Sequence, residues 1–584
     1  MNPRRETFLL FAMFAMVAIY LSLAALLPKD VFWISDNGNR LLQMQSIIQQ
    51  HFTSIQIVPS SGVADFSSLQ PPHFYRLDGA DYSYYPFAFP YLAAGPALLF
   101  GNRGLLLIPL LSAILLLMIY VRLWKSLFRD SAPVLPLFVL GLATPLFFYT
   151  LTFWEHTLTM LLAVSAVHLT IRAGQNCSAR HVCLAGLIAG AIPWFRPEGY
   201  LFCCLLPVAS FLAWRRGYRA GWLVVGILPS IAVLWFLNCR LYGSIFGLHT
   251  AKYLQLGELF GNRETSMALF LLGKLEVCYS YLFQYSASLP IGLLCGAPFL
   301  LAAIVGLCRR TGPGLANAIA AAALVGSGVL VCYSFRAEDP VFATLWTQGL
   351  SISTPFVVFF LLGIRRNLTE ASAEIRLLSV LTLGFLFFGT LAINNYERGI
   401  LWGGRYYLLV YPFLTILSFQ TYRDMLNGPA SGETKRATRW LFHLLLALSL
   451  SVQIHGVGLL FAKTRATQKI LDVLAASPSN HIVTDVFWLP EEMAAIFYRK
   501  KFLFLRHPGQ LSELQKLLVD ERANSFDLVL SPTYSDRQLL AGLRAFYPLI
   551  GSNTVASKGQ NWLTLNIYSF AAQLGTVPLT NRSE

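Results

Sequence analysis

The chain has 584 residues, of which 55% are hydrophobic and 12% charged, and its mean hydropathy is +0.56. A soluble domain carries roughly 25% charged residues, so these values exclude a single soluble globule. Lysine and arginine outnumber aspartate and glutamate by 44 to 29, which gives a formal net charge of +15. Polytopic membrane proteins collect basic residues in their cytoplasmic turns, so this excess indicates topology rather than nucleic-acid binding.

The first predicted element is a transmembrane helix. Two arginines, Arg4 and Arg5, precede residues 8–27, which contain almost no polar side chain. About 20 apolar residues are enough to span a bilayer. The segment is longer than a usual signal-peptide core, and Leu-Leu-Pro-Lys at 26–29 is a poor cleavage site. We therefore expect a retained helix rather than a cleaved signal.

Further apolar runs predict about thirteen crossings in total. They lie at 104–121, 133–150, 157–171, 182–195, 199–213, 222–239, 289–307, 315–334, 349–364, 377–393, 405–420 and 441–461. With the N-terminus in the cytoplasm, every inward turn carries at least two basic residues, as the positive-inside rule requires. These turns contain Arg122 and Lys125, Arg172 and Arg180, Arg215 and Arg216, Arg309 and Arg310, Arg365 and Arg366, and Lys435 and Arg436.

The same topology predicts two domains and a clear outer face. Residues 1–462 form a transmembrane module with outer loops 30–103 and 240–288, and residues 463–584 form a soluble extracytoplasmic α/β domain. Strands are expected at 481–488, 526–530 and 562–568, and helices at 511–519 and 538–546. The fold class is thus an α-helical polytopic protein of the inner (plasma) membrane with a C-terminal α/β domain.

The first outer loop contains a predicted helix and a candidate catalytic carboxylate. Leu41, Leu42, Met44 and Ile47 recur at helical spacing, which predicts an amphipathic helix on the membrane surface. Asp36 stands just before them, where the loop leaves the bilayer, and could accept a proton from an acceptor hydroxyl. The alternative is structural, because Ser35 or Asp36 could cap the helix.

Two predicted outer hairpins carry ionisable residues. Glu155 and His156 follow Trp154 between two apolar runs, and such residues at a membrane boundary are costly unless they are solvated or paired. Either they form a site or they occupy a solvated hairpin tip. Arg196 and Glu198 belong to a second hairpin of the same kind, and their structural interpretation is mutual pairing.

The last outer turn resembles an anion receptor. In Trp402-Gly403-Gly404-Arg405-Tyr406, a guanidinium and two glycines stand at the start of a predicted helix, which suits phosphate. Interfacial anchoring is the alternative. Lys252 is a weaker phosphate candidate, because a loop lysine is usually solvated. The nine cysteines show no disulfide or zinc spacing.

Four stretches together resemble the GT-C class of polytopic glycosyltransferases, particularly the bacterial relatives of protein mannosyltransferases that use polyprenyl-phosphate sugars. They are Asp36 in the first outer loop, Tyr84-Tyr85-Pro86 through Gly101, Phe153-Trp154-Glu155-His156, and Trp402 through Tyr406; Leu241 through Gly247 is a fifth, similar turn. Their order along residues 30–420 matches that class. This sequence departs from its pattern at Asn37, where some members have a second acid, and at Gly404, where many have proline.

The resemblance implies an inverting sugar transfer from a polyprenyl phosphate to an acceptor hydroxyl at the outer face. By this resemblance Asp36 would be the general base, Glu155 and His156 would shape the acceptor pocket, and Arg405 with Arg196 would neutralise the leaving phosphate. Lys252 and Tyr406 are further candidates for donor-phosphate binding from the sequence itself. The acceptor would be a glycan, lipid or protein of the cell envelope. The resemblance implies no cofactor, and the sequence leaves a divalent metal open.

Three other functions fit a chain of this kind. A transporter of a lipid or small solute is the main alternative, and it should show ionisable residues or broken helices near the bilayer midplane. The charged residues instead gather at the outer face. A non-catalytic scaffold and an oligosaccharide polymerase or ligase with the same helical plan are the remaining alternatives.

Overall fold

The protein is described from a computed structural model, in which the chain forms two compact units. The helical unit comprises Met1–Leu27 and Pro86–Phe461, and the sheet unit comprises Pro28–Tyr85 and Ala462–Glu584. The described residues are 3–59, 69–71, 74–128, 133–176, 178–248, 267–283, 289–308, 312–336, 349–393, 400–531, 537–557 and 560–572.

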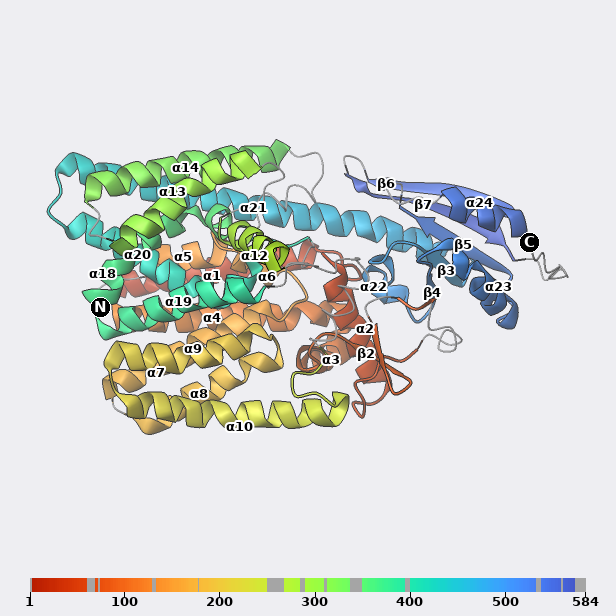
Figure 1. Cartoon of the computed structure of the whole chain (residues 1–584), viewed down its shortest axis with the longest axis horizontal. Coiled ribbons are helices and arrows are strands. Elements are labelled where there is room, and N and C mark those ends of the chain that lie inside the picture. The colour runs from red at the N-terminus through yellow and green to blue at the C-terminus, as the bar shows by residue number, and fades with distance from the viewer. Residues whose placement is uncertain are drawn as a thin grey trace. The chain divides into compact units, whose positions relative to one another are not determined.

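The helical unit consists of helices joined by turns (Figure 1). Their bounds are α1 (Pro3–Leu26), α3 (Ala88–Phe100), α4 (Leu107–Leu127), α5 (Val134–Leu142), α6 (Leu146–Thr150), α7 (His156–Asn176), α8 (Ala179–Gly190), α9 (Glu198–Trp214), α10 (Gly217–Tyr242), α12 (Met267–Leu282), α13 (Leu289–Cys308), α14 (Pro313–Arg336), α16 (Leu350–Ser353), α17 (Val358–Leu362), α18 (Ile364–Thr369), α19 (Ala373–Ala392), η5 (Arg405–Val410), α20 (Tyr411–Asn427) and α21 (Gly432–Ala476), the last of which continues into the sheet unit. Each predicted apolar run lies on one or more of these helices.

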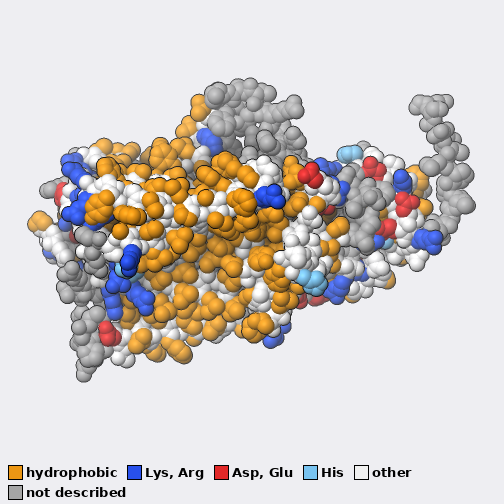
Figure 2. Space-filling view, turned by 90° about the horizontal axis from the view of Figure 1, so that it is seen from below, with side chains coloured by type: hydrophobic (Ala, Val, Ile, Leu, Met, Phe, Trp, Pro, Cys, Tyr) orange, Lys and Arg blue, Asp and Glu red, His pale blue; other side chains and the backbone are white. Residues whose placement is uncertain are grey.

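The helical unit has the surface of a membrane protein. In the described part of the chain, 7 helices are long and apolar enough to cross a bilayer, and further apolar helices are shorter. Large apolar side chains point outward, including Leu10 at 68% and Phe14 at 71% exposure. Figure 2 shows hydrophobic side chains covering most of one long face. The prediction of an α-helical polytopic membrane protein is confirmed; the count of about thirteen crossings stays a prediction.

Small residues bring two of these helices into close contact. A Cβ atom on Gly186 of α8 would lie 2.3 Å from the Leu223 carbonyl oxygen of α10, and one on Gly226 would lie 2.1 Å from the Cys183 carbonyl oxygen. Helices in lipid associate through such close backbone packing, because lipid tails are as apolar as the helix surfaces and the hydrophobic effect contributes little to helix association. In the segments expected to be outer loop, α3 and α12 are helices that the sequence analysis did not predict.

The C-terminal part of the sheet unit is the predicted α/β fold. Its five strands have the order β4-β3-β5-β7-β6, with β4, β3 and β5 parallel and β7 and β6 antiparallel to their neighbours. The strands are β3 (His481–Thr484), β4 (Lys501–Phe504), β5 (Ser525–Leu530), β6 (Leu549–Ser557) and β7 (Gln560–Ala571), and the covering helices are α23 (Leu511–Asp520) and α24 (Arg537–Phe546). The sequence did not indicate β4 or β6.

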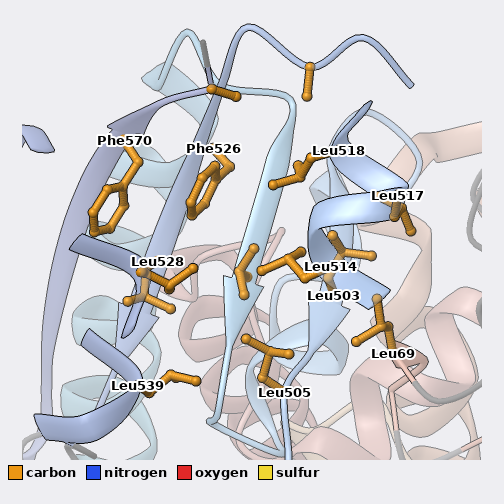
Figure 3. Packing of buried hydrophobic residues seen from close by; sticks show 14 of the residues in the cluster. Leu69, Leu503, Leu505, Leu514, Leu517, Leu518, Phe526, Leu528, Leu539 and Phe570 are labelled. Carbon is orange, nitrogen blue, oxygen red and sulfur yellow. The ribbon is translucent and has the colours of Figure 1, made fainter. Parts of the chain in front are cut away.

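One hydrophobic core holds this sheet and its helices together (Figure 3). Leu503, Phe526, Leu528 and Phe570 from the strands meet Leu514 and Leu517 from α23. Leu69 lies in the same core although it belongs to the first outer loop of the predicted topology. The first loop and the C-terminal domain are therefore one folded body in this structure.

The first-loop helix, α2 (Ser35–Gln49), forms where the spacing predicted it, but its packing differs from the prediction. Leu41, Leu42 and Ile47 are fully buried within the chain, and α2 contacts α22 (Leu489–Glu492) rather than presenting its apolar side chains at a membrane surface. A Cβ atom on Gly38 would lie 1.7 Å from the Glu491 carbonyl oxygen. Glycine thus permits a backbone contact that no larger residue allows.

Candidate functional site

Asp36 lies in the first turn of α2, where its negative charge suits the positive end of the helix dipole. The Tyr85 hydroxyl donates a hydrogen bond to Asp36 Oδ1. Arg40 Nη1 donates to the Asp36 carbonyl oxygen at 2.8 Å, and the Arg40 guanidinium lies 4.2 Å from the centre of the Tyr85 ring. Aspartate, tyrosine and arginine therefore form one polar group within the sheet unit.

The capping interpretation of Ser35 and Asp36 is wrong. Ile34, rather than Ser35 or Asp36, occupies the N-cap position of α2, and its side chain makes no capping hydrogen bond. Ser83 supports the same group, because its hydroxyl donates to Asn39 Oδ1 at 2.5 Å and accepts from the backbone N–H of Tyr85 at 3.1 Å. The strand that ends at Ser83 thus fixes the backbone of Tyr85 beside α2.

A second group of ionisable residues lies in the helical unit and is centred on Arg196. Its Nη1 atom donates to Glu155 Oε1 at 3.3 Å, and its Nε atom donates to Glu198 Oε2 at 3.0 Å, while Nη2 pairs with Glu198 Oε1. The predicted pairing of Arg196 with Glu198 is thus present but incomplete, because the same guanidinium also forms an ion pair with Glu155. Burial lowers the pKa of Arg196, but Glu198 and Glu155 outweigh it and hold the pKa above its ordinary value.

Glu155 and His156 do not occupy a solvated hairpin tip. Their exposed fractions are 1% and 2%. His156 begins α7, and its ring contacts those of Tyr149 and Trp154, at centroid distances of 4.6 Å and 4.8 Å. A buried carboxylate requires a cationic or hydrogen-bonding partner, and Arg196 provides one to Glu155.

Arg405 lies among aromatic rings in the same unit. Its guanidinium is 5.1 Å from the centre of the Trp154 ring and 4.9 Å from that of Tyr406, and Nη2 donates to the Tyr406 hydroxyl at 2.8 Å. Arg405 and Arg196 lie close enough to interact electrostatically with each other and with Tyr149, so Arg405 and the Arg196 ion pairs are parts of one cluster. We call Glu155, His156, Arg196, Glu198 and Arg405 the arginine–carboxylate cluster.

The turn before Arg405 is held by several buried contacts. The Tyr149 hydroxyl donates to the Trp402 carbonyl oxygen at 3.0 Å, and the Trp402 indole donates to Gln453 Oε1 at 2.9 Å. Gly403 has φ +59°, and a Cβ atom on it would lie 2.6 Å from Pro145. Only glycine readily adopts that backbone conformation at so close a contact. The two glycines of the sequence motif thus position Arg405 near Trp154.

Sequence reasoning missed three residues that complete these groups. Tyr85 and Trp154 appeared only as parts of motifs, and Arg40 was not considered. Arg40 is near Asp36 in the sequence, but Tyr85 and Trp154 are far from Asp36 and Arg405, so only Arg40 could have been found from sequence proximity. Lys252 lies outside the described residues. Among the residues that the structure describes, no three His, Cys, Asp or Glu side chains form a group that could hold a metal ion.

No protein-family model matches the sequence, and no curated protein sequence matches it. Similar solved structures include ArnT from Cupriavidus metallidurans bound to undecaprenyl phosphate, which is 12% identical over 97% of this chain and 99% of that chain with a TM-score of 0.49.

A further similar structure is the archaeal oligosaccharyltransferase AglB from Archaeoglobus fulgidus, in complex with an inhibitory peptide and a dolichol-phosphate. It is 12% identical over 99% of this chain and 76% of that chain, and its TM-score is also 0.49. A likeness at this identity and TM-score assigns no role to a residue.

Proposed function

We propose that this chain is a glycosyltransferase that moves a sugar from a polyprenyl-phosphate donor to an acceptor hydroxyl at the outer face of the inner membrane. The observation that carries the proposal is the arginine–carboxylate cluster. It contains two largely buried guanidiniums among apolar helices and aromatic rings. The side chain of Arg196 is 11% exposed, and the residue Arg405 is 5% exposed. Arginine is the side chain best suited to bind a phosphate group through two parallel hydrogen bonds.

In the proposed reaction, the acceptor oxygen attacks the anomeric carbon of the donor sugar. The bond between that carbon and the phosphate oxygen breaks, its electron pair stays on the phosphate, and the configuration at carbon inverts. Arg405 and Arg196 neutralise the leaving phosphate, and Tyr406 orients Arg405 through their hydrogen bond. Lys252, a lysine of the second outer loop, is a further candidate contact to the donor phosphate.

Asp36 takes the proton from the acceptor hydroxyl in this proposal. A carboxylate can do so when it is held in place and its charge is supported by hydrogen bonds. The Tyr85 hydroxyl provides such a bond, and Arg40 holds the Tyr85 ring. Glu155 and His156 shape the acceptor pocket, and Glu155 also fixes Arg196. The N-terminus is cytoplasmic and the C-terminal domain extracytoplasmic in the proposed topology.

The test is donor consumption by purified protein in liposomes that contain a panel of polyprenyl-phosphate sugars and envelope-derived acceptors. We expect one donor to be consumed, with release of the polyprenyl phosphate and a sugar-modified acceptor. Arg405→Gln should lower turnover by about 10²- to 10³-fold, as loss of one preorganised charge-stabilising group commonly does. Movement of a solute across the liposome without donor consumption would favour the transporter instead.

A further inference from the structure

A basic and aromatic surface lies on the first turns of α21, away from the groups used in the proposed reaction. Arg436, Arg439, Trp440 and His443 line an open cavity of 520 Å³ together with Gly432. Residues spaced by three or four positions share one face of an α-helix. We call these five residues the α21 basic surface.

The cations of this surface are uncompensated. Within the described part of the chain, neither Arg436 nor Arg439 makes an ion pair or a side-chain hydrogen bond. Glu433, the nearest acid along the helix, makes no ion pair there either. His443 is exposed, and its Nδ1 donates to the Arg439 carbonyl oxygen at 2.6 Å, which orients the imidazole. Two guanidiniums are thus available for an external anion.

This surface belongs to the basic end of the helical unit. The Thr434 carbonyl oxygen accepts from Asn317 Nδ2 at the start of α14, at 3.1 Å. Arg365 Nη1 donates to the Cys308 carbonyl oxygen at the end of α13. Figure 2 shows Lys and Arg side chains gathered at one end of the hydrophobic face. The charge pattern of the sequence places this end in the cytoplasm.

Exposed apolar side chains lie next to the two arginines along α21. Trp440 is 61% exposed, and Leu444, one turn further along α21, is 47% exposed. Tryptophan favours the level of lipid headgroups, and leucine favours the acyl-chain region beyond it. A ligand that fits this order of groups has an anionic head and an apolar tail. Both features belong to an anionic phospholipid.

We propose that the α21 basic surface binds the headgroup phosphate of an anionic phospholipid in the cytoplasmic leaflet, with phosphatidylglycerol as the type ligand. Arg436 and Arg439 bind the phosphate oxygens, and Trp440 packs at the level of the glycerol backbone. Phosphatidylethanolamine binds more weakly because its ammonium group offsets the same charge. The proposal does not depend on the proposed enzymatic function.

The test is native mass spectrometry of the full-length protein in detergent, titrated with phosphatidylglycerol or phosphatidylethanolamine. We expect wild type to bind phosphatidylglycerol more tightly. Arg436→Gln/Arg439→Gln should weaken that binding by about thirtyfold, since each arginine near an anionic surface contributes about 1 kcal/mol and 1.4 kcal/mol is tenfold. Lys469→Gln/Lys516→Gln removes two exposed charges elsewhere and should change it little.

Two results would overturn the proposal. One is equal phosphatidylglycerol binding by wild type and Arg436→Gln/Arg439→Gln. The other is displacement of the lipid by an equal concentration of inorganic phosphate, which would indicate a site for the free anion. If the glutamine variant does not fold, Arg436→Lys/Arg439→Lys keeps both charges but loses the planar fork. It should bind several-fold more weakly, and unchanged affinity would contradict the guanidinium contacts.

Discussion

A buried ion pair fastens three segments of the sheet unit, and its removal gives a quantitative prediction. Lys463, near the end of α21, pairs with Glu492 of α22, and their side chains are 0% and 4% exposed. Lys463 Nζ also donates to the Phe32 carbonyl oxygen at 3.1 Å, just before α2. These contacts hold the helix that carries Asp36 beside the C-terminal domain.

Lys463→Met would leave Glu492 buried without its cation. Loss of one partner from a buried pair costs about 3–5 kcal/mol of unfolding free energy, whereas replacement of both partners by apolar residues is often neutral or stabilising. We therefore expect Lys463→Met to be strongly destabilising and Lys463→Met/Glu492→Leu to be much closer to wild type. Lys469→Met, an exposed lysine on the same helix, is the matched control.

The destabilisation should also depend on pH. Burial raises the pKa of Glu492, with Lys463 opposing the shift. Without Lys463, the folded state should hold a proton on Glu492 above the pH at which the unfolded state releases it. The stability of Lys463→Met relative to wild type should then fall as pH rises above about 4.5.

Thermal unfolding of the purified proteins in detergent, at about pH 5 and about pH 7.5, measures both effects. Equal destabilisation of the single and double variants would refute the reasoning, because it would mean that packing, rather than an uncompensated charge, controls the stability. A single-variant deficit that does not grow with pH would contradict the proton linkage.

Three further predictions follow from other contacts. Gly456→Ala should lower the thermal unfolding temperature and impair transfer, because its Cβ would lie 2.1 Å from the Trp402 ring, whereas Gly458→Ala, with nothing within 4 Å, should do neither. Arg405→Lys should retain more transfer activity than Arg405→Gln but less than wild type, as measured by donor consumption, because it keeps the charge and loses the stacked fork. Burial raises the pKa of Tyr498 to about 12. The contribution of the protonated Tyr498 hydroxyl to the unfolding free energy should therefore be present below about pH 10 and lost as pH rises toward 12. Tyr498→Phe should remove that part of the alkaline unfolding curve.

The membrane fold was predictable because length and hydropathy report directly on bilayer crossing. Each apolar run forms helix, and five elements of the C-terminal domain lie where alternation and helical spacing placed them. The strand β4 was not predicted because Phe502 through Leu505 are consecutive apolar residues, and a short continuous apolar run shows neither the alternation of a strand nor the spacing of a helix. The packing of α2 against α22 could not be predicted, because apolar spacing shows that one face of a helix is buried but not which element covers that face.

The candidate site was predictable in its residue types but not in its pairing. Glu155 and Arg196 lie 41 residues apart, and their ion pair exists only because α7 and α9 begin close together. The link between Asp36 and Tyr85 spans 49 residues and depends on the strand before Tyr85. Sequence spacing carries little information about such long-range contacts. The roles of Glu155, His156, Arg196, Arg405, Tyr406 and Lys252 remain proposals.

The general-base role of Asp36 is the claim on which the proposed mechanism depends most directly. The decisive measurement is sugar transfer in liposomes by wild type, Asp36→Asn and the control Asp78→Asn, an exposed turn residue of the same unit. We expect wild type and Asp78→Asn to turn over the lipid-linked donor and Asp36→Asn, equally folded, to lose about 10²- to 10⁴-fold in rate while still binding the donor. Full turnover by Asp36→Asn would contradict the mechanism.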